Sequence, residues 1–192
     1  AGGGLYYLLT LGMPAVFALC IAELVLVMVL SARLGKMSIA GARGLFFAYA
    51  ILNGVTFSAV FFAYDVQILL SVFALTALYF GALAAYGWLT KRDLSGLGTI
   101  LGFSVLFLLV FWVLSMFLPL GAFERIICFI GLAVFMGCTA YDTQRIKHLH
   151  AEYGEDYEMS KKASIFAALQ LYLDFINIFL YILRLLGRRS SN

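Results

Sequence analysis

The hydrophobic residues of this chain are grouped in six blocks, each about as long as a helix that crosses a membrane. The blocks cover residues 12–34, 42–64, 68–89, 98–118, 123–146 and 164–186. A helix needs about twenty apolar residues to cross ~30 Å of hydrocarbon, and no block has the strict alternation of a membrane β-strand. The pattern predicts an all-α, polytopic transmembrane helix bundle of six spans, with a single domain over residues 1–192.

The connections between the blocks are short, except for the one between the fifth and the last. This segment, RIKHLHAEYGEDYEMSKKA, is polar and covers residues 145–163. We expect it to be a loop long enough to fold partly outside the membrane. His148 and His150 have no third ligand nearby in the sequence, and the acidic run 152–158 lacks the spacing of a calcium loop, so we interpret both as solvated.

The composition supports a membrane protein. Of the 192 residues, 64% are hydrophobic and only 12% are charged, whereas soluble domains are nearer half apolar and a quarter charged. The net charge of +3 gives no reason to expect a nucleic-acid partner. Cys20, Cys128 and Cys138 are too scattered for a disulfide framework or a metal site, so we expect packing cysteines, no metal and no cofactor.

Basic residues cluster at alternate connections, which predicts the orientation in the membrane. One side carries Arg33, Lys36, Arg43, Lys91, Arg92, Arg145, Lys147, Lys161 and Lys162. The other carries Arg125, Arg184, Arg188 and Arg189. The first, third and fifth connections are therefore expected in the cytoplasm. The chain begins AGGGLYY, without Met and without the pattern of a signal peptide, so we expect native residues upstream.

Asp174 places an ionisable group inside the last block. About eleven Leu, Ile and Phe residues between Leu171 and Leu186 contribute roughly −5 kcal/mol to insertion, against about +2.5 to +3.5 kcal/mol for a central Asp. The span can therefore insert with Asp174 in it. An ionisable residue within a membrane span indicates a functional site and is expected to have a partner.

Depth in the membrane indicates the partners of Asp174. Asp174 lies about ten residues into its span, or ~15 Å, and Glu23 lies at the same depth if Arg33 marks the inner boundary. Asp142 lies near the inner end of the fifth span, at the level of Arg33. We expect Asp174 with Glu23 near the midplane and Asp142 with Arg33 nearer the cytoplasm. Side-chain reach and helix tilt could also bring Asp142 and Asp174 together.

Two carboxylates that meet in a low dielectric cannot both ionise cheaply, so they share a proton. An arginine beside one of them favours its charged form. Such a group could act as a pH switch, as a constriction that attracts cations, or as a structural ion pair that fixes helix packing. The residues alone leave these three interpretations open.

Smaller polar and small residues in the spans suggest helix contacts. Gly98, Gly102 and Gly131 are expected to allow close approach of helices, and Asn53 and Thr56 are interpreted as groups that hydrogen-bond between helices. Tyr141 and Asp142 also suggest an intramembrane aspartyl protease. That class needs a GxGD motif, which LYLD replaces here, so the protease is a minor alternative and the chain is not expected to be an enzyme.

Four motifs together resemble the Bax inhibitor-1 family, also called the transmembrane Bax-inhibitor-motif family. They are IAELVLVMVLSARLGKMS, TKRDLS, AYDTQRIK and LYLDFINIFLYILRLLG. The similarity extends over nearly the whole chain and is greatest to the prokaryotic members. It implies seven spans, with the last helix surrounded by the others. The first block here would then be the family's second span, and most of the first would lie upstream.

The resemblance implies a pH-dependent calcium leak channel in the prokaryotic plasma membrane. It implies that Asp142 and Asp174 form a di-aspartyl pH sensor, that Arg33 exchanges with this pair as part of the gate, and that Glu23 and both aspartates line the ion path. Calcium would be the permeant ion, and lipid and other membrane proteins the partners. The alternative of another class is a non-transporting membrane scaffold that regulates cell survival or a partner complex.

Overall fold

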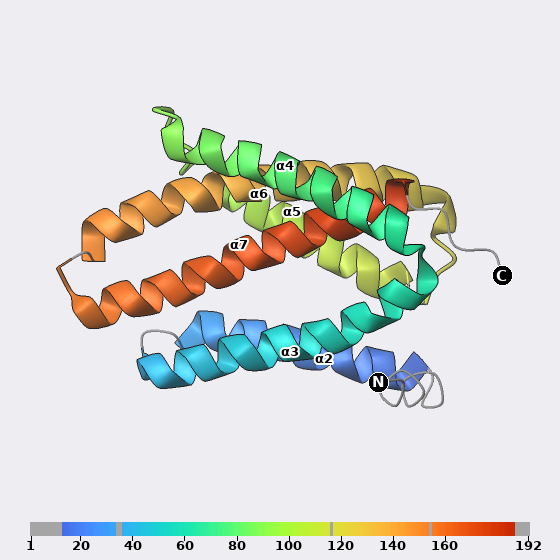
Figure 1. Ribbon diagram of the computed structural model, residues 1–192, viewed down its shortest axis with the longest axis horizontal. Coiled ribbons are helices and arrows are strands. Elements are labelled where there is room, and N and C mark those ends of the chain that lie inside the picture. The colour runs from blue at the N-terminus through green and yellow to red at the C-terminus, as the bar shows by residue number, and fades with distance from the viewer. Residues whose placement is uncertain (1–12, 34–35, 116, 154, 187–192) are drawn as a thin grey trace. The chain divides into compact units, whose positions relative to one another are not determined.

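Six long α-helices follow one another along the chain in the computed structural model, which describes residues 13–33, 36–115, 117–153 and 155–186 (Figure 1). They are α2 (Met13–Arg33), α3 (Ile39–Ala63), α4 (Val66–Leu89), α5 (Leu97–Ser115), α6 (Glu124–Tyr153) and α7 (Tyr157–Leu186), and the short 3-10 helix η2 (Gly121–Phe123) precedes α6. No β-strand occurs within these ranges. The predicted all-α fold is confirmed.

The helices from α3 to α7 make this a multi-pass membrane protein. Within the described ranges, these five are long and apolar enough to cross a membrane. Helix α2 has 21 residues. Its side chains are described only from Ala18 onward, so its own crossing stays a prediction. The expectation of an upstream segment and the tail residues Arg188 and Arg189 concern parts of the chain outside the described residues.

The prediction of a long polar loop over residues 145–163 is wrong, because α6 continues to Tyr153 and α7 begins at Tyr157. Helices α6 and α7 have 30 residues each, or ~45 Å, so both extend well beyond the hydrocarbon core. Asp156 caps α7, because its Oδ1 accepts hydrogen bonds from the backbone N–H groups of Glu158 and Met159, both at 3.0 Å. Glu158 then pairs with Lys162 one turn later at 2.6 Å. The polar residues therefore continue the two helices.

The helices form two compact units. The first contains α2, α3 and residues 157–169 of α7, and the second contains α4, α5, α6 and residues 170–186 of α7. Among the described helices, α7 is central in the sense that it alone contributes a long segment to both units. The assignment of residues 1–192 to a single domain stays a prediction.

Small residues set the helix spacing in the second unit. A Cβ atom on Gly87 of α4 would collide with the backbone carbonyl of Ala140 on α6. A Cβ on Gly98 of α5 would lie 2.6 Å from the Tyr141 hydroxyl oxygen, and one on Gly131 would enter the Tyr181 ring. Gly98 and Gly131 therefore allow the close approach that the sequence suggested. Gly102 does not, because nothing lies within 4 Å of its Cβ direction.

Gly87→Ala should destabilise the protein, because the atom that its methyl group meets belongs to the backbone of another helix and cannot rotate away. We expect a loss of about 1–3 kcal/mol, as for other overpacked sites, which a thiol-reactive dye would detect as earlier thermal exposure of the buried Cys128 and Cys138. Gly81→Ala on the same helix is the matched control, since nothing lies within 4 Å there. Equal melting of the two variants would contradict the close contact.

Candidate functional site

Asp142 and Asp174 meet in the interior of the second unit. Asp142 lies on α6 and is 8% exposed, and Asp174 lies on α7 and is 4% exposed. Their carboxyl groups are within hydrogen-bonding reach of each other. The structure thus brings together the two aspartates that helix tilt and side-chain reach allowed to meet and that the family resemblance implied as a pair. Their role as a sensor stays a prediction.

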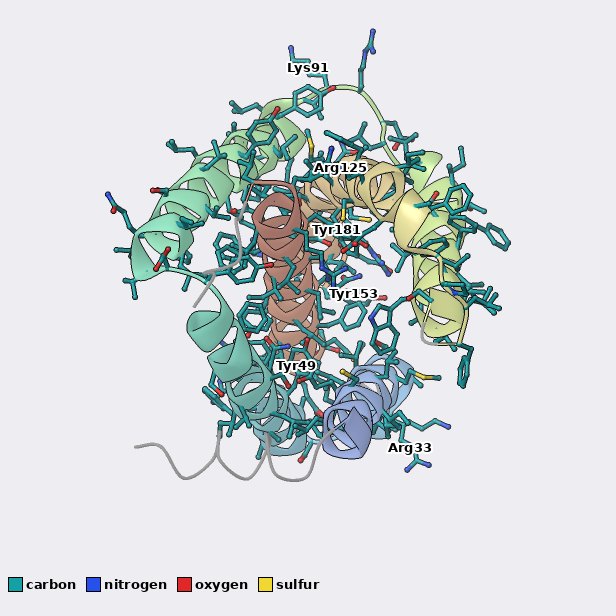
Figure 2. All side chains as sticks on the ribbon, turned by 90° about the vertical axis from the view of Figure 1, so that its right-hand side faces the viewer. Arg33, Tyr49, Lys91, Arg125, Tyr153 and Tyr181 are labelled. Carbon is teal, nitrogen blue, oxygen red and sulfur yellow. The ribbon has the colours of Figure 1, made fainter. Side chains whose placement is uncertain are left out.

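The register of α6 against α7 explains this meeting. Tyr181 of α7 packs on Phe135 of α6, with ring centroids 6.0 Å apart, and its ring also covers Gly131. Figure 2 shows Tyr181 between the two helices. Asp142 lies seven residues after Phe135, and Asp174 lies seven residues before Tyr181. Because the helices run in opposite directions, two turns along each one lead from the aromatic contact to the aspartate pair.

The pair has too few hydrogen-bond donors for two charged carboxylates. Oδ2 of Asp174 is buried, and no described residue hydrogen-bonds to it. Asp174 is within reach of Thr139, but the Thr139 hydroxyl donates to the carbonyl oxygen of Phe135 at 2.9 Å. An ionised carboxylate can only accept hydrogen bonds. A proton held by the pair supplies the missing donor, as one carboxylic acid can then donate to the other carboxylate.

The positive charge that acts on Asp142 is Arg145. Arg145 is exposed on α6 and follows Asp142 by three residues, which places both on one face of the helix. The sequence predicted Arg33 as the arginine beside the pair and Arg145 only as a cytoplasmic charge, although its i, i+3 spacing from Asp142 is a signal for the closer role. Arg33 is the last residue of α2, in the first unit, and is exposed (Figure 2). Its pairing with the aspartates stays a prediction.

Glu23 has hydrogen-bond partners within the first unit. One oxygen of its carboxylate accepts from the Thr56 hydroxyl at 2.7 Å, and the other accepts from the Asn53 amide at 3.3 Å. Asn53 and Thr56 belong to α3, so they are the interhelical groups that the sequence suggested. The expected layer of Glu23 with Asp174 and the place of Glu23 in an ion path stay predictions.

Gln144 is a structural residue of the site that the sequence analysis missed. Its side chain is 6% exposed. Its Oε1 accepts from the backbone N–H of Leu94 at 2.8 Å, and its Nε2 donates to the carbonyl oxygen of Arg92 at 2.7 Å. Lys147 donates to the carbonyl oxygen of Trp88 at 2.8 Å, at the end of α4. These bonds attach α6, just beyond Asp142, to the connection between α4 and α5.

Two buried carboxyl groups that lie side by side are suited to sharing a proton. Cys138 lies beside both aspartates, yet no three His, Cys, Asp or Glu residues are grouped as metal ligands within the described ranges. His148 and His150 are exposed on α6. Two carboxyl groups without a third ligand can hold a proton or attract a passing cation, and they offer little for tight metal binding.

Comparison with known proteins identifies the family. The model of the family described as "Inhibitor of apoptosis-promoting Bax1" matches residues 1–191. The chain belongs to the Bax inhibitor family. Asp142, Asp174 and the helices that carry them are therefore features of a Bax inhibitor family protein.

Three similar proteins come from bacteria. The chain is 42% identical to the inner membrane protein YbhL of Escherichia coli over 172 residues, which are 89% of this chain and 74% of YbhL. It is 44% identical over 172 residues to a protein of Deinococcus radiodurans, and the match covers 90% of this chain and 74% of that protein. It is 34% identical over 174 residues to a membrane protein of Streptococcus pyogenes, and the match covers 91% of this chain and 75% of that protein. With its five spanning helices, the chain is a multi-pass protein of the bacterial plasma membrane.

A proton shared by Asp142 and Asp174 should give the infrared band of a protonated carboxyl group at neutral pH in lipid vesicles. Asp142→Asn and Asp174→Asn should each remove this band at neutral pH, because the Asn amide can donate to the remaining carboxylate. Asp65→Asn, at an exposed aspartate just before α4, is the matched control and should keep the band. Retention of the band in both pair variants would assign it to another group.

Proposed function

We propose that this Bax inhibitor family protein is a pH-dependent calcium leak channel, gated by the proton shared between Asp142 and Asp174. The observation that carries the proposal is the buried carboxyl pair between α6 and α7, which lacks donors for two charges. A carboxyl pair whose only role was to fix helix packing would be more stable with a hydrogen-bond donor beside it. A pair that depends on a proton responds to pH instead.

Loss of the shared proton supplies the force for gating. Two negative charges at hydrogen-bonding distance in a low-dielectric interior repel each other strongly. The repulsion acts between α6 and α7, because each helix carries one aspartate of the pair. Arg145 lies on the α6 side and partly offsets the charge of Asp142. A change of pH therefore changes the separation that these two helices prefer.

The ion path is proposed to use oxygen ligands of low affinity. Calcium prefers carboxylate and other oxygen ligands, which Glu23, Asp142 and Asp174 supply. Arg33 is proposed to exchange with the aspartate pair during gating, as the resemblance to the prokaryotic members implies. Calcium is the permeant ion in this proposal, so no bound cofactor is required.

Calcium flux into vesicles of pure lipid, read by an enclosed calcium dye, tests the function. The wild-type leak should change with pH. Asp142→Asn and Asp174→Asn should have a leak that no longer follows pH. Since Asn resembles a protonated Asp, each leak should equal the wild-type leak at acid pH, where the pair keeps its proton. Asp65→Asn should behave as wild type.

Two outcomes would overturn the channel. A wild-type protein that folds in pure lipid and gives no flux at any pH would favour the non-transporting scaffold. A pH-dependent flux that survives in both pair variants would show that another group is the sensor. Thermal melting of each variant in the same vesicles separates these outcomes from simple unfolding.

Arg33→Gln should change the pH at which the leak switches, because the arginine is proposed to pair with the ionised aspartates in one state of the gate. Lys36→Gln is the matched control, since Lys36 is an exposed cation three positions further along the chain. The flux assay measures both variants. An equal effect of the two substitutions would indicate general surface electrostatics and remove Arg33 from the gate.

A further inference from the structure

Thr139 is a polar residue of α6 that lies one helical turn before Asp142, next to the carboxyl pair. It is completely buried, at 0% exposure. It precedes Asp142 by three residues, so both point from the same face of α6. It is also within hydrogen-bonding reach of Asp174. One hydroxyl group is therefore placed next to a carboxyl pair that lacks a donor.

The Thr139 hydroxyl has one proton and two acceptors within reach. In the structure it donates to the carbonyl oxygen of Phe135, at 2.9 Å. Rotation about the Cβ–Oγ bond moves only the hydrogen atom and redirects it to Asp174, because the position of a hydroxyl hydrogen follows its surroundings. The first orientation suits a pair that holds its own proton, and the second suits a pair that has lost it.

We propose that Thr139 is a positioning residue of the pH sensor, whose hydroxyl turns from Phe135 to Asp174 when the pair loses its proton. The hydroxyl then stabilises the ionised pair and lowers the pH at which the proton leaves. The inference rests on the proposed function for its physiological meaning, but proton release from the pair can be measured without calcium.

The other groups that face the pair in the second unit are few. On α6 they are Cys138, beside both aspartates, and Arg145, which acts on Asp142. Helices α4 and α5 contain no Asp, Glu, Lys, Arg or His. On α7, the charged residue besides Asp174 in the described residues 170–186 is Arg184, which lies ten residues away and acts on Cys128 and Tyr181 and not on the pair. Thr139 is therefore the uncharged donor on α6 that can respond to the charge of Asp174.

Infrared titration of the protonated carboxyl band in lipid vesicles tests the inference. Thr139→Val keeps the shape of the side chain and removes the hydroxyl, so it should raise the midpoint of proton release by about one to two pH units, as expected for a lost hydrogen bond to a charged group. Thr139→Ser keeps the hydroxyl and should restore a midpoint near that of wild type.

Thr143→Val is the matched control. Thr143 is also buried on α6, at 6% exposure, and its hydroxyl donates to the carbonyl oxygen of Thr139 at 2.7 Å. Thr143→Val deletes the same kind of intrahelical hydrogen bond, so the midpoint of proton release in this variant should stay at the wild-type value. Equal shifts for Thr139→Val and Thr143→Val, or none for Thr139→Val, would overturn the inference.

Combining Thr139→Val with each aspartate variant shows which aspartate the Thr139 hydroxyl contacts. In Asp142→Asn only Asp174 titrates, and adding Thr139→Val should still raise the midpoint. In Asp174→Asn only Asp142 titrates, and adding Thr139→Val should have no effect. A shift in the second background and not in the first would assign the hydroxyl to Asp142. A wild-type protein without calcium flux but with these infrared shifts would refute the channel and keep Thr139.

Discussion

The buried carboxyl pair of Asp142 and Asp174 is the constraint on which the second unit depends. Neither aspartate can be charged beside the other without repulsion, and the packed helices supply no donor to Oδ2 of Asp174. The pair is satisfied when it holds a proton. In the proposed function, this proton forms part of the contact between α6 and α7, just as the Tyr181 ring does two turns away.

Glu23 shows the other way to keep a carboxylate among apolar helices. Asn53 and Thr56 direct one donor to each of its oxygens, so both carboxylate oxygens have a hydrogen-bond partner on α3. The protein therefore contains one carboxylate matched to donors and one carboxyl pair without them. This difference separates an interhelical hydrogen-bonded carboxylate from the proposed pH sensor.

The hydrophobic blocks predicted the helices well, because block length follows from membrane thickness. The pattern failed over residues 145–163, where hydropathy marks the end of the membrane but Asp156 and the Glu158–Lys162 pair continue the helices. Depth suggested Glu23 as the partner of Asp174, and only the family resemblance implied the pair of Asp142 with Asp174. Their meeting depends on the register that Phe135 and Tyr181 set, which is known only once α6 and α7 are known to be neighbours. The bonds of Gln144 go to backbone atoms, which have no signature in the sequence.

The attachment of α6 to α4 determines which part of the second unit is free to slide. The backbones touch at Gly87 and Ala140, and Gln144 and Lys147 fasten the same stretch of α6 to the end of α4 and the connection beyond it. Asp142 lies on α6 between Ala140 and Gln144, so these contacts fix its position relative to α4. Next to Asp174, Phe175 of α7 contacts Phe73 and Phe80 of α4 through ring edges, and such contacts slide more easily than the backbone contact of Gly87 with Ala140. If loss of the proton gates the protein as proposed, α7 is therefore the helix expected to move against the α4–α6 pair.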